Sequence, residues 1–209
     1  MIIAVDGPTA SGKGTIAAAL ARHYGLPHLD TGLLYRAVGW SVAAAGGDPD
    51  DAADALHGCD FADALLAEPA LRDEATGALA SRVSVHAAVR AALFERQRDF
   101  ATQPGGAVLD GRDIGTVIAP DAEVKLFVTA SVPARALRRW REMQARLGEH
   151  APTLAAMEAD LTARDARDAG RATAPLTASS DAVTLDTSEM DAAAAIAAAI
   201  EAVERVRAR

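Results

Sequence analysis

The chain has 209 residues, of which 50% are hydrophobic but only 4% aromatic, and its formal net charge is −8. This length fits one domain with a sizeable aliphatic core, and the negative charge argues against a general nucleic-acid or membrane-surface binder. No apolar run approaches the roughly 20 residues that a membrane-spanning helix needs. Residues 1–5 carry neither a basic start nor a cleavage site, so they are expected to form a strand and not a signal peptide. The single cysteine, Cys59, cannot form an internal disulfide, which favours a reducing, cytoplasmic setting.

Residues 7–15, GPTASGKGT, are expected to bind phosphate, and we call them the phosphate loop. An apolar run precedes them and an alanine-rich stretch with helical spacing, residues 16–24, follows, so the context is strand, loop, helix. Glycines let backbone N–H groups surround phosphate oxygens, and the start of the helix favours an anion. Lys13 adds a positive charge that can follow the terminal phosphates. The predicted donor-nucleotide site is Gly7, Pro8, Thr9, Ala10, Ser11, Gly12, Lys13, Gly14 and Thr15.

The residue after Lys13 is Gly14, where many such loops carry a hydroxyl that holds Mg²⁺. The form GxxxxGKGT resembles the nucleoside monophosphate kinases, which implies that Mg²⁺ is held largely by phosphate oxygens and water. The protein groups expected beside the metal are Thr15 and, through water, Asp110.

A second strand is predicted at residues 27–29, and a second helix begins near Leu33, with Asp30 or Thr31 as its cap. Arg36 lies about one turn into this helix, where its planar guanidinium suits a phosphate. A plain helix cap followed by a surface arginine is the alternative. Residues 47–103 are predicted to form short helices inserted between the second and third strands, at 50–56, 69–85 and 87–100.

The third strand, from residue 107, ends in Asp110, and the fourth spans 124–129. Ser131 is predicted to cap a basic helix, residues 133–147, which is expected to be mostly solvated with one arginine near the nucleotide. A helix at 152–166, a fifth strand at 182–185 and a terminal helix at 190–207 follow. Strands that alternate with helices predict a parallel sheet covered on both faces, with the ligand at the carboxyl ends of the strands.

Two polar clusters follow from this arrangement. Asp113, beside Arg112, can accept a hydrogen bond from the exocyclic amine of a base, while Arg112 can bind phosphate. The run RDARDAGR, residues 164–171, brings Arg167 and Arg171 together on one helical face, which is unfavourable unless an anion arrives. A lid that closes over phosphates fits this pattern, and a solvated charged face is the alternative. The five histidines show no metal-ligand or triad spacing.

The segments GPTASGKGT, LDTGLLYRA, DGRDIGTVIAPDA and RDARDAGRATAPL together resemble the bacterial cytidylate kinases, nearly from end to end. The resemblance implies an α/β nucleoside monophosphate kinase fold and transfer of the γ-phosphoryl group of ATP to CMP or dCMP. It also implies a core of residues 1–46, 104–147 and 172–209, an acceptor-binding insertion at about 47–103 and a short lid at about 148–171. Residues 57–72 are shorter than in many relatives and leave little room for the small extra sheet found there.

By position, the resemblance places Thr31, Arg36 and Arg112 on the acceptor phosphate. The cytosine would be read by Ser81, Arg90, Asp113 and Arg171, and the ribose would be held by Arg164 and Asp168. Lys13 and Arg167 would carry the charges on the transferring group, and together with Arg112 they form the predicted catalytic set.

Two other functions stay open at this point. One is a related kinase acting on UMP, AMP or another metabolite, and the other is a nucleotide-binding switch that turns over slowly. A switch usually carries a separate base-reading sequence such as NKxD, which is absent here. We expect a monomer, because no exposed heptad pattern stands out.

Overall fold

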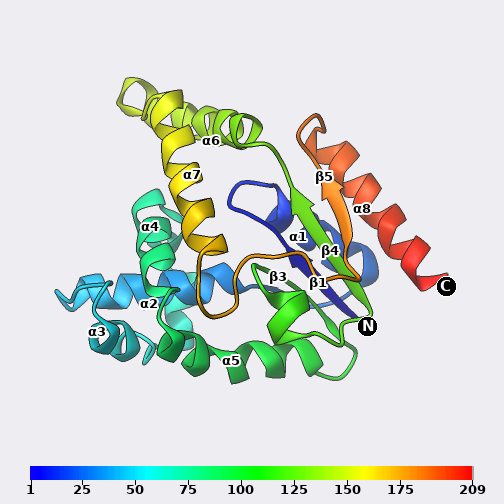
Figure 1. Ribbon diagram of the computed structural model, residues 1–209, viewed down its shortest axis with the longest axis horizontal. Coiled ribbons are helices and arrows are strands. Elements are labelled where there is room, and N and C mark those ends of the chain that lie inside the picture. Colours follow the sequence, from blue (N-terminus) through cyan, green and yellow to red (C-terminus); the bar gives the residue numbers. More distant parts are fainter. Residues whose placement is uncertain (209) are drawn as a thin grey trace.

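The computed structural model describes residues 1–208, and in this range it contains a five-stranded, wholly parallel sheet (Figure 1). The predicted α/β fold is confirmed, and the strand ends differ from prediction by at most two residues, with the fourth strand as predicted. The strands are β1 (Ile2–Asp6), β2 (His28–Asp30), β3 (Ala107–Gly111), β4 (Val124–Thr129) and β5 (Val183–Asp186). Across the sheet they lie in the order β2-β3-β1-β4-β5.

Helices cover both faces of the sheet because β1, β3 and β4 present apolar side chains to both sides. On one face, α1 (Lys13–Tyr24) and α8 (Ala192–Arg207) pack against Ile3 and Val5. On the other face, α5 (Ala87–Thr102) and a single π-helical turn, Ile114–Ile118, pack against Ala4 and Leu109. The π turn was not predicted.

The segment between β2 and β3 contains helices joined by turns, with no strand at residues 31–106. It contains α2 (Thr31–Ala44), α3 (Ala52–His57), the 3₁₀ turns η1 (Asp63–Ala67) and η2 (Pro69–Arg72), α4 (Glu74–Val83) and α5. The prediction of one continuous helix over 69–85 was wrong. The backbone of Asp73 is extended, with φ −72° and ψ 156°, and this residue separates η2 from α4.

A helical hairpin after β4 projects from the sheet and returns beside α4 (Figure 1). It consists of α6 (Val132–Leu147), the short turn η4 (Gly148–His150) and α7 (Leu154–Ala169). As predicted, the Ser131 hydroxyl caps α6 by accepting from the Ala134 amide at 3.4 Å. The hairpin has an apolar contact surface of its own, which includes Met143, Met157 and Leu161. This packing is separate from the apolar clusters on the two faces of the sheet.

Asp30 occupies the predicted cap position of α2, but its carboxylate makes no capping bond. No helix within residues 1–208 is long and apolar enough to cross a membrane.

Candidate active site

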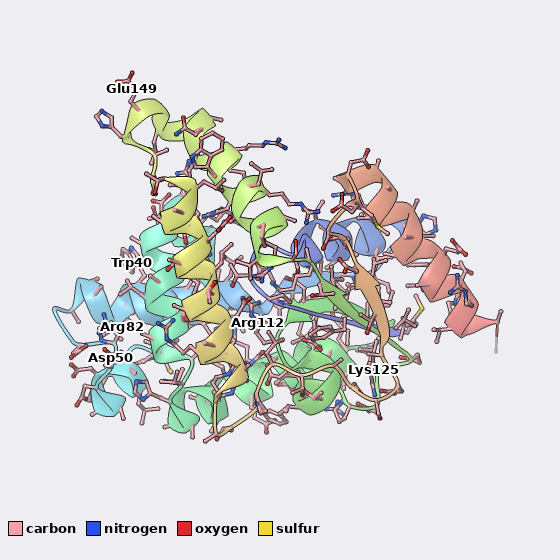
Figure 2. All side chains as sticks on the ribbon, turned by 45° about the horizontal axis from the view of Figure 1, so that its top comes forward. Trp40, Asp50, Arg82, Arg112, Lys125 and Glu149 are labelled. Carbon is pink, nitrogen blue, oxygen red and sulfur yellow. The ribbon has the colours of Figure 1, made fainter. Side chains whose placement is uncertain are left out.

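A cavity of about 1100 Å³ opens at the carboxyl ends of the strands, between the phosphate loop, α2, α4 and the α6–α7 hairpin. Arg112 lines this cavity, and Figure 2 shows it close to α7. Of the predicted site residues, all line this cavity except Gly7, Pro8 and Arg167. Its volume is slightly above the roughly 300–1,000 Å³ typical of small-molecule sites, so it is large for a site that binds a single small ligand.

The phosphate loop has the backbone geometry that its glycines predict. Gly7 has φ +155°, and a Cβ there would lie 2.0 Å from the Val128 carbonyl oxygen of β4. Gly12 has φ +89° and caps α1, which begins at Lys13. The first amide groups of α1 have no partners within the helix, so they are available to an anion in the cavity.

Two side chains from other segments bind backbone carbonyl oxygens of the phosphate loop. Arg135 of α6 donates to the Thr9 carbonyl oxygen at 3.1 Å and pairs with Asp165 of α7 at 2.5 Å. Thr187, after β5, donates to the Ser11 carbonyl oxygen at 2.9 Å. The basic helix was expected to be mostly solvated with one arginine near the nucleotide; Arg135 is only 3% exposed and contacts the phosphate loop, whereas Arg141 and Arg146 are exposed. Sequence spacing gave no signal for the pair of Arg135 with Asp165, since Asp165 lies 30 residues further along the chain.

Lys13 lies at the start of α1 with its ammonium bonded to the Pro8 carbonyl oxygen at 3.3 Å. Burial, helped by the positive charge of Arg112, lowers the pKa of this ammonium to about 8. A polyphosphate beside it would stabilise the charged form and raise this pKa again. This environment suits an anionic ligand.

Arg112 joins the phosphate loop to α7. Its Nη2 donates to the Thr9 hydroxyl at 2.6 Å, and its Nε donates to the Asp168 carboxylate at 2.8 Å. Burial alone would raise the pKa of Asp168, but Arg112 and Arg171 hold it below its usual value. A guanidinium in this position can contact phosphates from both ends of the cavity.

The far end of the cavity carries a buried polar cluster. Arg90 pairs with Asp113, and both are less than 10% exposed. The Arg90 guanidinium also lies 5.5 Å from the centre of the Tyr35 ring. Arg171 is 8% exposed, and its buried Nε and Nη2 have no hydrogen-bond partner among residues 1–208. Buried donors without partners are costly, so this end is built for a polar ligand.

The run RDARDAGR does not form a solvated face. Arg164 and Asp168 are each 5% exposed, and Arg167 alone of the three arginines is exposed. Arg167 donates to the Ser81 hydroxyl at 2.6 Å; Ser81 lines the cavity, whereas Arg167 does not. Its predicted contact with the transferring group therefore requires its side chain to leave Ser81.

Glu74, at the start of α4, binds the hairpin to the helical insertion. Its carboxylate pairs with Arg164 of α7 at 2.5 Å and with Arg139 of α6. Arg36 lies nearby and donates to the carbonyl oxygens of Leu71 and Asp73 at 2.8 and 2.9 Å. Burial alone would raise the pKa of Glu74, but Arg164 and Arg139 hold it below its usual value. Sequence reasoning missed Glu74, because both partners lie more than 60 residues away.

We expect Glu74→Gln to loosen the hairpin. Loss of the two charge pairs should raise the opening equilibrium of α7 about tenfold, since partly buried pairs contribute on the order of 1 kcal/mol. Amide hydrogen exchange in α7 measures this opening. Glu142→Gln is the matched control, because Glu142 pairs with Arg139 within α6 and joins no other element. Equal exchange in the two variants would contradict the assignment.

The carboxylates near the phosphate loop are suited to a hard cation. Asp110 receives a hydrogen bond on its backbone oxygen from the Thr31 hydroxyl at 2.8 Å, and its carboxylate lies 2.8 Å from the His28 ring. Burial, and then the charge of Asp110, raises the pKa of Asp30. Residues 1–208 contain no cluster of three or more His, Cys, Asp or Glu side chains able to hold a metal. These oxygens fit Mg²⁺ that keeps water and phosphate ligands.

The sequence profile of the family described as "Cytidylate kinase" matches residues 3–205. The chain is 56% identical to the cytidylate kinase of Caulobacter sp. (strain K31) over 210 aligned positions, covering 100% of this chain and 96% of the relative. It is also 56% identical to the cytidylate kinase of Xanthobacter autotrophicus, covering 100% and 99% of the two chains. The chain belongs to the cytidylate kinase family. The predicted resemblance is thereby confirmed.

A solved structure supports the fold of this cytidylate kinase family member. An uncharacterised protein from Eubacterium ventriosum superposes with a TM-score of 0.55 at 14% sequence identity, covering 100% of this chain and 99% of the other. At that identity the likeness concerns the fold alone.

Proposed function

We propose that the protein transfers the γ-phosphoryl group of ATP to CMP or dCMP, giving ADP and CDP or dCDP, as a step in pyrimidine nucleotide metabolism. One observation carries the proposal. A phosphate loop and a buried Arg90–Asp113–Arg171 cluster occupy opposite ends of one cavity, with Arg112 between them. Full-length relatives named cytidylate kinase support it.

ATP would bind at the end of the cavity that the phosphate loop forms. Backbone amides at the start of α1 would bind the β-phosphate, and Lys13 would follow the transferring γ-phosphoryl group. An oxygen of the acceptor phosphate attacks the γ-phosphorus, and the bond from phosphorus to the β-phosphate oxygen breaks. Charge neutralisation by Lys13 and Arg112 lowers the barrier, because the negative charge is spread over the equatorial oxygens.

Cytosine would be recognised at the other end of the cavity, by the buried polar cluster. Asp113 would accept from the exocyclic amine of the base, and the partnerless donors of Arg171 would bind its ring acceptors. Uracil presents a carbonyl where cytosine has this amine, so it would leave Asp113 facing an acceptor. Arg36 and Thr31 would hold the phosphate. Mismatched buried polar groups of this kind can discriminate by about 10⁴-fold.

The α7 helix would supply the remaining contacts. Arg164 and Asp168 would hold the ribose, and Ser81 of α4 would lie near the base; all three line the cavity. Arg167 would move from Ser81 to the transferring group when both substrates are bound. Residues 47–103 would serve as the acceptor-binding insertion and residues 148–171 as the lid.

Mg²⁺ is part of the proposal. Thr15 and, through water, Asp110 would hold it, and it would neutralise charge on the phosphates of ATP. Thr15 lies in the first turn of α1 and lines the cavity, as does Asp110.

Closure of the lid would exclude water from the site. Arg112 already joins the Thr9 hydroxyl to Asp168 of α7, so bound phosphates would strengthen a link that exists without them. Exclusion of water prevents ATP hydrolysis from competing with transfer. We propose that the enzyme acts as a monomer in the cytoplasm.

The test is an acceptor panel with coupled detection of ADP. CMP, dCMP, UMP and AMP are compared at equal concentration with saturating ATP and Mg²⁺. We expect CMP or dCMP to turn over at least about 10²-fold faster than AMP, and ATP alone to give almost no turnover. Preference for AMP or a non-nucleotide acceptor would refute the proposal, and fast turnover of ATP alone would indicate an ATPase.

A further inference from the structure

Asp6 is a buried carboxylate that the proposed mechanism does not use. It is the last residue of β1 and lies directly before Gly7 of the phosphate loop. Only 5% of the residue is exposed. Its Oδ1 accepts from the Ile114 amide at 2.8 Å, and its Oδ2 accepts from the Gly115 amide at 2.7 Å.

These two amides immediately follow Asp113, the predicted reader of the base. The Asp113 carbonyl oxygen accepts in turn from the amides of Val117 and Ile118, at 2.9 and 3.1 Å, within the π turn. The backbone after Asp113 is therefore held on one side by its own turn and on the other by Asp6. A shift of this backbone would move the Asp113 side chain relative to Arg90.

The space around Gly115 leaves the backbone little freedom. A Cβ built at Gly115 would lie 3.2 Å from the Lys125 Cδ and 3.4 Å from the Asp6 Oδ2. The Lys125 ammonium is itself bound to Asp181 at 2.7 Å and to the Pro120 carbonyl oxygen at 2.6 Å. Gly115 is thus packed between a fixed lysine stem and the Asp6 carboxylate.

We infer that Asp6 is a positioning residue, which fixes the base-reading Asp113 relative to the phosphate loop and so aligns the acceptor with the γ-phosphoryl group. The inference rests on the proposed role of Asp113 in reading cytosine. A carboxylate suits this position, because each of its two oxygens accepts from one of the two neighbouring N–H donors. Asparagine would offer one oxygen and would point an NH₂ group at the second donor.

Protonation of Asp6 should have an effect similar to that of replacing it with asparagine. Burial raises the pKa of Asp6 to about 6, against the lowering effect of the Gly115 and Ile114 amides. The charged groups that face it are Asp113, which raises the pKa further, and Lys13, which lowers it. Lys125, which packs on Gly115, directs its ammonium to Asp181. Below pH about 6, one of the two acceptors is therefore lost.

The test compares Asp6→Asn with the wild-type protein in KM for CMP, KM for ATP and the ratio of kcat/KM for CMP over UMP. We expect the variant to raise the KM for CMP about tenfold or more, to lower the CMP/UMP ratio about tenfold, and to leave the KM for ATP within about threefold. Asp121→Asn is the control, since Asp121 is an exposed carboxylate paired with Arg98. Its constants should match the wild type.

A pH profile separates positioning from a merely structural role. In the wild type, the KM for CMP should rise as pH falls through about 6, partly because the CMP phosphate titrates there as well. In Asp6→Asn the KM for CMP should rise only through titration of the CMP phosphate. The KM of the variant divided by that of the wild type should therefore fall toward one in this acidic range. A ratio that is constant with pH would overturn the inference.

Gly115→Ala is the second variant if Asp6→Asn fails to fold. Its added methyl group pushes the amide away from Asp6 without removing a buried charge, and it should lower the CMP/UMP ratio in the same direction. Unchanged selectivity in a folded variant would overturn the inference and leave the proposed function intact. A wild-type protein without preference for CMP over UMP would overturn base reading by Asp113 and the inference that rests on it, whereas preference for AMP over CMP would overturn the proposed function.

Discussion

Replacing Lys13 with methionine is expected to lower kcat about 10³-fold, with a change of only a few-fold in the KM for CMP. Methionine keeps most of the side-chain volume but removes the charge beside the transferring phosphoryl group. The amides at the start of α1 remain and should retain part of the ATP affinity. Steady-state kinetics with both substrates varied in turn measure the two effects separately.

The same side chain predicts a pH dependence. Because the pKa of Lys13 is about 8 in the free protein, kcat/KM for ATP should fall as pH rises through about 8. In Lys13→Met this limb of the profile should disappear. Arg22→Ala is the control, since Arg22 is an exposed cation of the same helix. A Lys13→Met variant with near wild-type kcat would exclude Lys13 from the chemistry.

Replacing Asp113 with alanine is expected to raise the KM for CMP about 10²-fold or more, far beyond any change in the KM for ATP. The carboxylate lies at the acceptor end of the cavity, paired with Arg90, so its loss should spare the donor site. Equal effects on both substrates would refute base reading by Asp113.

The Asp113→Ala variant should also lose stability, and this needs a control. Loss of the Asp113 carboxylate leaves the buried Arg90 guanidinium without its charged partner, which typically lowers the free energy of unfolding by about 3–5 kcal/mol. The double variant Arg90→Met with Asp113→Leu removes both charges, so denaturant unfolding should show stability close to that of the wild type. CMP binding should remain lost in the double variant. Recovery of CMP binding together with stability would mean that Asp113 acts only through the fold.

The sequence predicted the elements that local pattern controls. The apolar runs of β1 and β4 and the glycine spacing around Lys13 were sufficient to predict the parallel sheet and the phosphate loop. The prediction of one continuous helix over 69–85 was wrong, because Asp73 adopts an extended backbone conformation that helix periodicity does not reveal. The sequence did not show which arginine of the basic helix is buried, because the burial of Arg135 depends on the return of α7 beside α6.

The candidate site divides in the same way. Lys13, Arg112 and Asp113 stand in recognisable local sequences, and the structure brings them to one cavity. Nothing in the sequence indicated the role of Asp6, because its partners Ile114 and Gly115 lie more than 100 residues away.

By itself, the sequence determined which residues could bind phosphate, which stretches could form buried strands, and to which family the chain belongs. These properties depend on neighbours within a few positions, where spacing and side-chain chemistry are visible. Only the tertiary structure decided which charges pair, as Glu74 does with Arg139 and Arg164. The physical reason is that a buried charge takes whichever partner packing brings within about 3 Å, and packing joins segments from the whole chain.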